Sequence, residues 1–153
     1  MPPLRPLRVA VLAEEGDLAA ARVARLTGAR LLPLAPHGPL ALRGYDLVHL
    51  FVPAASLVER LDGLRLALPR VVAATPVGEP EPAALDRRVH RYVFPTQAEA
   101  LAWARAGATL GRVMVVGPGE HEAEAWAVVW RESAVMARRA GLGELVRGLR
   151  RGR

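Results

Sequence analysis

The sequence predicts an α/β fold, with a parallel sheet of about six strands and helices on both of its faces. Short, almost wholly apolar runs alternate along the chain with segments whose apolar residues have helical spacing. A strand that is apolar along its whole length is buried on both faces, and a parallel sheet covered by helices provides that environment. Because crossovers in such sheets are right-handed, we expect a Rossmann-like arrangement that ends in a long C-terminal helix.

The strand pattern recurs along the chain, and each run is bounded by a turn, a proline or a helical segment. The runs are residues 8–13, 29–36, 45–53, 70–76, 89–96 and 112–117. Pro33 lies inside the second run and has no backbone N–H. We therefore expect this strand at an edge of the sheet or at a bulge.

Helical spacing fills the intervals between the strands. The predicted helices are residues 17–29, 54–68, 97–108 and 121–140, with a further turn or two at 144–151 and one helical turn in the loop 77–88. We expect Asp17 to cap the first helix, Gly28 to end it and Pro69 to end the second. Gly141 and Gly143 are expected to interrupt the C-terminal segment.

Two of these helices have a predicted buried face. In the helix at 97–108 the expected face is Ala98, Leu101, Ala102, Ala104 and Arg105. In the helix at 121–140 the residues that share one face are Trp126, Val129, Trp130, Ser133 and Ala137. That second face suits packing on the sheet, and if it were exposed it would mark an interface with a partner.

The length of 153 residues predicts one domain over 1–153. Its sheet core is expected over 1–120 and its C-terminal helical segment over 121–153. No internal repeat or long linker divides the sequence.

Composition excludes several kinds of site. The chain has no cysteine, which rules out disulfides, thiolate metal sites and a cysteine nucleophile, and its four histidines lack metal-binding spacing, so we predict no metal. It has no lysine, which rules out a P-loop. No apolar run is long enough to span a membrane, and acidic residues directly follow the first apolar run, so we predict a cytoplasmic protein. Many prolines and few amides are compatible with a thermophile.

The net charge of +6 raises the question of a polyanionic partner. All 21 basic residues are arginines, and six of them lie near the C-terminus: Arg138, Arg139, Arg147, Arg150, Arg151 and Arg153. Arginines on solvated faces account for this pattern, and the few aromatic residues argue against a nucleic-acid surface. Weak polyanion binding by the C-terminal arginines is kept as an alternative.

Candidate site residues follow from the fold, because open parallel sheets bind ligands beyond the carboxyl ends of their strands. The predicted ligand-binding residues are Gly16, Thr75, Thr96, Gly119 and Glu120. The candidates for catalysis are His49, Glu14 and Glu15. The dinucleotide-binding fingerprint is absent after the first strand, where two carboxylates would repel a pyrophosphate, so we predict no cofactor.

Each candidate also has a purely structural interpretation. Glu14 and Glu15 point in opposite directions in an extended segment, so they are either acid/base groups or solvated and capping side chains. His49 is either catalytic or a buried, hydrogen-bonded histidine. The segment 117–120, GPGE, is either an anion site at a helix N-terminus or only a turn.

Three segments carry a resemblance to a known family: YDLVHLFVP, VHRYVFPTQAEALAWARAGA and GRVMVVGPGEH. Over residues 7–121 the chain resembles the N-terminal, acceptor-side Rossmann domain of GT-B retaining glycosyltransferases of the glycosyltransferase 4 type. Asp46 and His49 match the family's third-strand pattern, and Thr96 stands where serine is usual.

The match extends to the glycine turn and also has departures. Gly119 matches the family's turn glycine, with Pro118 where asparagine is common. The family often has a second histidine at the position of Phe51, and its usual glycine-rich first loop is replaced here by AEEGD.

The resemblance implies a function. In the family, the segment 111–121 leads into a second domain that holds the nucleotide-sugar. We expect that this donor domain is missing and that its returning, tryptophan-bearing helix is kept. The chain would then bind a sugar or glycoconjugate acceptor, or serve as the accessory half of a second glycosyltransferase chain. It would not be catalytic as an isolated monomer. The alternative is a non-catalytic interaction module that forms a homo-oligomer through its C-terminal helix.

Overall fold

The computed structural model describes residues 5–34, 42–64 and 71–151, with side chains up to residue 137. Its strands form one sheet in the order β2-β1-β3-β4-β5-β6, and every described pairing is parallel. The strands are β1 (Val9–Ala13), β2 (Arg30–Pro33), β3 (Leu47–Pro53), β4 (Val71–Val77), β5 (Arg91–Phe94) and β6 (Val113–Val115). This arrangement confirms the predicted α/β, Rossmann-like fold class.

The strand order reverses between β1 and β3, which are hydrogen-bonded neighbours although β2 lies between them in the sequence. The chain first moves outward from β1 to β2 and then crosses back to build the rest of the sheet from β3. Pro33 ends β2, which is an edge strand as predicted. In doubly wound sheets, such a switch point opens a crevice at the carboxyl ends of the strands.

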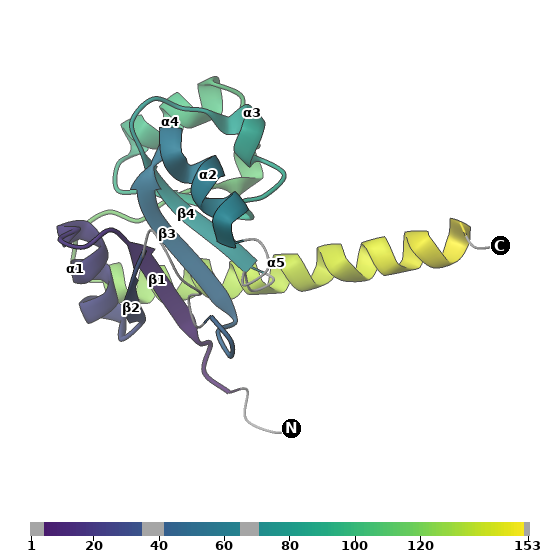
Figure 1. Cartoon of the computed structure of the whole chain (residues 1–153), viewed down its shortest axis with the longest axis horizontal. Coiled ribbons are helices and arrows are strands. Elements are labelled where there is room, and N and C mark those ends of the chain that lie inside the picture. The colour runs from purple at the N-terminus through teal and green to yellow at the C-terminus, as the bar shows by residue number, and fades with distance from the viewer. Residues whose placement is uncertain (1–4, 35–41, 65–70, 152–153) are drawn as a thin grey trace.

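The helices cover both faces of the sheet (Figure 1). They are α1 (Leu18–Thr27), α2 (Ala54–Leu64), α3 (Pro82–Leu85), α4 (Gln97–Arg105) and α5 (Glu122–Arg151). Helices α2, α3 and α4 lie on one face, whereas α1 and the first half of α5 cover the other. The described residues contain no helix that is long and apolar enough to cross a membrane.

Both predicted ends of the first helix agree with the structure. The Asp17 carboxylate accepts a hydrogen bond from the Ala20 N–H at 3.0 Å, which caps α1. Gly28 ends α1 with φ of 74°, a left-handed conformation that glycine adopts without strain. The predicted end of α2 at Pro69 lies outside the described residues.

Two helix predictions were wrong. The buried residues of α4 are Ala100 and Trp103, while Ala98, Leu101 and Ala102 are exposed. Trp103 sets the buried face because it is by far the largest apolar side chain of the helix. The expected interruption at Gly141 and Gly143 is also absent, because α5 is continuous over 30 residues. A glycine inside a helix weakens it by about 1 kcal/mol but retains its backbone hydrogen bonds.

The alternation of side chains along each strand creates two cores. One packs residues such as Leu50, Tyr92 and Phe94 against α2, α3 and α4. The other packs Val11 and Phe51 with residues of α1 and α5. From α5 this second core receives Trp126, Val129, Trp130 and Ala134, with Ala137 packed against it. This confirms that the tryptophan face of α5 packs on the sheet.

Candidate functional site

His49 lies at the centre of β3 and its side chain is fully buried between the sheet and α5. Trp130 donates its indole N–H to His49 Nδ1 at 3.1 Å, and His49 Nε2 is 2.8 Å from Thr75 Oγ1. An indole nitrogen can only donate, so Nδ1 must be the unprotonated acceptor. The ring proton is therefore on Nε2, which donates to the hydroxyl of Thr75.

This network keeps the imidazole neutral. Burial lowers the pKa of His49 from 6.5 to about 3, because the charged form would lose its hydration. The ring also packs against Phe51 and Trp126, with ring centroids 4.9 and 5.1 Å away. Of the two interpretations of His49 from the sequence, the structure shows a buried and hydrogen-bonded histidine. Both ring nitrogens are used within the core.

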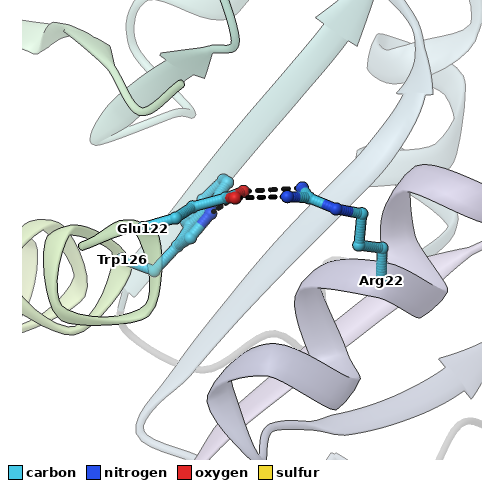
Figure 2. Close-up of polar contacts among 3 residues, drawn as sticks. All are labelled: Arg22, Glu122 and Trp126. Atoms are coloured by element: carbon cyan, nitrogen blue, oxygen red, sulfur yellow. Dashed lines mark hydrogen bonds and ion pairs between the residues drawn. The ribbon is translucent and has the colours of Figure 1, made fainter. Parts of the chain in front are cut away.

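Sequence reasoning missed the clamp that attaches the start of α5 to α1 (Figure 2). Glu122, in the first turn of α5, is buried, and both of its carboxylate oxygens accept hydrogen bonds from Arg22. Trp126 adds a longer hydrogen bond, from its indole N–H to Glu122 Oε1 at 3.4 Å. These hydrogen bonds, donated by Arg22, lower the pKa of Glu122 and raise the pKa of Arg22. The clamp fixes the position at which α5 meets α1.

A second unforeseen contact involves Arg91, the first residue of β5, which is only 4% exposed. Its guanidinium donates to the Gly111 carbonyl at 2.7 Å and to Ser133 Oγ at 3.4 Å, and it also contacts the sulfur of Met136. Burial lowers the pKa of Arg91, although a guanidinium stays charged at neutral pH. These contacts join β5 and the turn before β6 to the middle of α5.

At the carboxyl edge of the sheet, the β1/β3 switch point carries Glu14, Glu15 and Gly16. Arg60 of α2 donates to Glu14 Oε1 at 2.9 Å, so the loop after β1 is linked to the helix after β3. Glu15 is exposed, and Gly16 has φ of 88°, which a residue with a side chain would adopt only with strain. The switch point therefore presents carboxylates and one guanidinium to solvent.

Two other predicted ligand-binding residues, Thr75 and Thr96, lie away from the switch point and from each other. Thr75 is the hydrogen-bond partner of His49. Thr96 caps α4: its hydroxyl accepts a hydrogen bond from the Glu99 N–H at 3.3 Å and donates one to Glu99 Oε2 at 3.0 Å. It follows β5, so at about 4.8 Å per strand it lies roughly 14 Å along the sheet from β1.

Gly119 and Glu120 lie exposed in the turn before α5. This turn leads directly to Glu122, so it ends on the α1 side of the sheet. Glu14, Glu15 and Gly16 are thus consecutive residues at the switch point. His49 and Thr75 lie elsewhere, in the core between the sheet and α5. In the described part of the chain, no group of three or more acidic or histidine side chains could hold a metal ion.

Asp46, which the resemblance singles out, also has a structural role. Its carboxylate accepts hydrogen bonds from the Arg8 backbone N–H at 2.8 Å and from the Arg5 side chain at 2.7 Å. It therefore holds the segment before β1 against the start of β3.

Comparison of the chain with protein-family models, with curated proteins and with solved structures found no match.

Proposed function

We propose that the chain binds a sugar or glycoconjugate acceptor at the carboxyl edge of its sheet, as its resemblance to an acceptor-side glycosyltransferase domain suggests. The observation that supports this best is the polar set at the β1/β3 switch point: the ion pair of Glu14 with Arg60, and the exposed Glu15 next to it in the chain. Open α/β sheets bind their ligands at such a point. Glu15 is exposed there, and Glu14 is 59% exposed despite its ion pair.

The chemistry of this set suits hydroxyl groups better than phosphates. Carboxylate oxygens accept hydrogen bonds from hydroxyl groups, and a guanidinium donates to hydroxyl and ring oxygens. Two carboxylates beside one arginine give the set a net negative charge, which opposes a pyrophosphate. The proposed ligand is therefore an uncharged, hydroxyl-rich acceptor, and a donor nucleotide-sugar would have to be held by a second chain.

The test is calorimetric titration of the purified protein with neutral mono- and oligosaccharides, glycoconjugates and nucleotide-sugars. We expect saturable binding of a neutral glycan that weakens at least about tenfold in Glu15→Gln and Arg60→Ala, because each change removes a charged hydrogen-bonding group. Glu132→Gln is the matched control, since Glu132 is an exposed carboxylate on α5.

Two results would contradict this proposal. One is no binding of any neutral glycan at millimolar concentration. The other is binding that Glu132→Gln weakens as much as Glu15→Gln does. Substitution of His49 is a poor test, because its side chain is inside the core and its loss would disturb folding.

A second candidate function is a protein-interaction module, and one observation favours it. Helix α5 continues well beyond the sheet that its first half covers (Figure 1). A helix needs a packing partner for most of its stability, and the second half of α5 runs away from the sheet that its first half covers (Figure 1). In this function α5 would be the surface that recruits a partner.

A further inference from the structure

Helix α5 is much longer than the sheet beneath it. Its 30 residues span about 45 Å, whereas the seven residues of β3 span about 23 Å. The first half of α5 packs against β4 and α1, and the second half extends away from the body of the protein (Figure 1). The surplus length therefore serves no purpose in covering the sheet.

The first half of α5 also carries apolar side chains that the sheet does not cover. Val128 and Val135 are 45% and 42% exposed, whereas Trp126 and Trp130 are each 4% exposed. At 100° per residue, Val128 lies roughly 160° from Trp126 around the helix, and Val135 lies roughly 140° from Trp130. The two valines therefore lie on the side of α5 opposite the sheet.

These valines begin a row with seven-residue spacing. The same spacing continues in the sequence to Leu142 and Leu149, and Leu145 is offset from Leu142 by three. We call Val128, Val135, Leu142 and Leu149 the outer row. Two paired helices form a seam from two apolar positions in every seven residues, and the outer row supplies one of them. Leu145 supplies the second position after Leu142, whereas Arg131 and Arg138 stand at the same offset after Val128 and Val135. The row runs from the sheet-covered half of α5 into the projecting half.

The two halves of α5 have opposite charge. Residues 122–136 include three glutamates and one arginine, whereas residues 137–151 include five arginines and one glutamate. Glu122 is buried and paired with Arg22, so Glu124 and Glu132 are the acidic residues of the first half that remain for a partner. A parallel pair of such helices would place one basic half against the other. An antiparallel pair would place each basic half beside the acidic half of its partner, which is favourable. The charge pattern therefore fits a second copy of the same helix in the antiparallel direction.

We propose that two copies of this chain associate through antiparallel pairing of their α5 helices along the outer row. The projecting half of each helix would lie on the outer side of its partner's sheet-covered half. Because Val128 and Val135 lie on the side of α5 opposite the sheet, the two sheets would sit at opposite ends of the pair and would not compete for the same surface. This inference rests on the second candidate function and names its partner.

The first test is sedimentation of the whole chain and of two variants. The unmodified chain is expected to be a dimer. The double change Val128→Glu and Val135→Glu should weaken dimerisation by about 100-fold or more, because it places unpaired charges in an apolar seam. Leu101→Glu is the matched control, since Leu101 is 43% exposed on α4, across the sheet from α5. Circular dichroism must show that all three proteins are folded.

The second test reads the direction of pairing, using the absence of native cysteine. In an antiparallel pair, a mixture of Val128→Cys and Leu149→Cys chains should form disulfide-linked heterodimers, while Val128→Cys alone should not cross-link. Efficient cross-linking of Val128→Cys with itself would overturn the antiparallel arrangement.

A monomeric unmodified chain at every soluble concentration would overturn the pairing itself. A monomer that binds anionic vesicles or heparin through α5 would overturn it while leaving the interaction function intact. Glycan binding is measured separately, so its failure would leave this result unaffected.

Discussion

The two faces of the sheet are packed against their covering helices by different kinds of side chain. The face covered by α2, α3 and α4 is built from aliphatic and aromatic side chains such as Leu57, Phe94 and Trp103. The face covered by α1 and α5 contains every buried polar residue in the described part of the chain: His49, Thr75, Arg91, Glu122 and Ser133. Each of these five has a hydrogen-bond partner.

The difference reflects how the position of the covering helices is determined on each face. Helices α2 and α4 directly follow strands that they cover, so short connections and apolar packing suffice to place them. Helix α5 comes last and extends beyond the sheet, so apolar packing alone would leave its position and direction less defined. Its contacts with Arg22, His49 and Arg91 are directional and lie along its first half. We infer that they fix the direction in which the projecting half points.

The largest expected effect contrasts one buried tryptophan from each face of the sheet. Trp130→Ala and Trp103→Ala each remove a buried aromatic ring, which costs about 3–5 kcal/mol of unfolding free energy. Trp130→Ala also leaves His49 Nδ1 without its donor, which adds about 1–3 kcal/mol. Urea denaturation should therefore find Trp130→Ala the more destabilising. Equal losses would remove the distinction between the faces.

The second prediction concerns pH. The folded-state pKa of His49 is about 3, below its ordinary value of 6.5, so between these values the unfolded chain binds a proton that the folded chain does not. Stability should therefore fall as the pH is lowered, by about 2 kcal/mol between neutral pH and about pH 5. His90, whose pKa burial also lowers, adds to the loss in the same direction.

This pH dependence can be assigned to His49 by comparison with a variant. His49→Gln should lose most of the slope between about pH 6.5 and 5, a range that lies above the ordinary titration of carboxylates. A slope that is the same in both proteins would show that His49 is not its source.

The third prediction concerns the local cap of α4, in contrast with the long-range contacts that hold α5. Thr96→Ala removes the N-terminal cap of α4 and should cost about 1 kcal/mol of unfolding free energy. Thr96→Ser should recover the lost unfolding free energy, because serine keeps the capping hydroxyl. Thermal unfolding of the three proteins is the measurement. Full loss in the serine variant would contradict a capping role.

The smallest expected effect is that of the clamp. Arg22→Ala should lower the midpoint of thermal unfolding slightly, because Arg22 is half exposed and its charge is screened by water. Amide hydrogen exchange should increase mainly in the first turns of α5, where Glu122 loses its partner. Arg25→Ala, an exposed arginine on the same helix, is the control and should leave α5 unchanged.

The sequence predicted the sheet well because the signal of a buried strand is local. Each strand is a short apolar run, and the structure places all six within the predicted runs or one residue beyond them. The alternation of these runs with amphipathic segments was enough to predict a parallel sheet. The face of α4 was wrong because alanines at several positions satisfied the helical spacing, and only Trp103 distinguishes the buried side.

The candidate site was harder to predict because its contacts join distant parts of the chain. Glu122 and Arg22 are 100 residues apart, and His49 and Trp130 are 81 apart. An acidic residue in the first turn of a helix has an ordinary local explanation in the helix dipole, so Glu122 gave no sign of a distant partner. A histidine inside an apolar strand was a stronger signal, and a buried, hydrogen-bonded side chain was one of the two interpretations that it allowed.

The central claim is that His49 is neutral and links the sheet to α5 through its hydrogen bond with Trp130. The most direct test is a long-range ¹H–¹⁵N correlation spectrum of the imidazole, recorded from about pH 8 to about pH 5. We expect a proton on Nε2, none on Nδ1, and no titration over this range. A protonated Nδ1, or a midpoint near the ordinary pKa of histidine, would contradict the account.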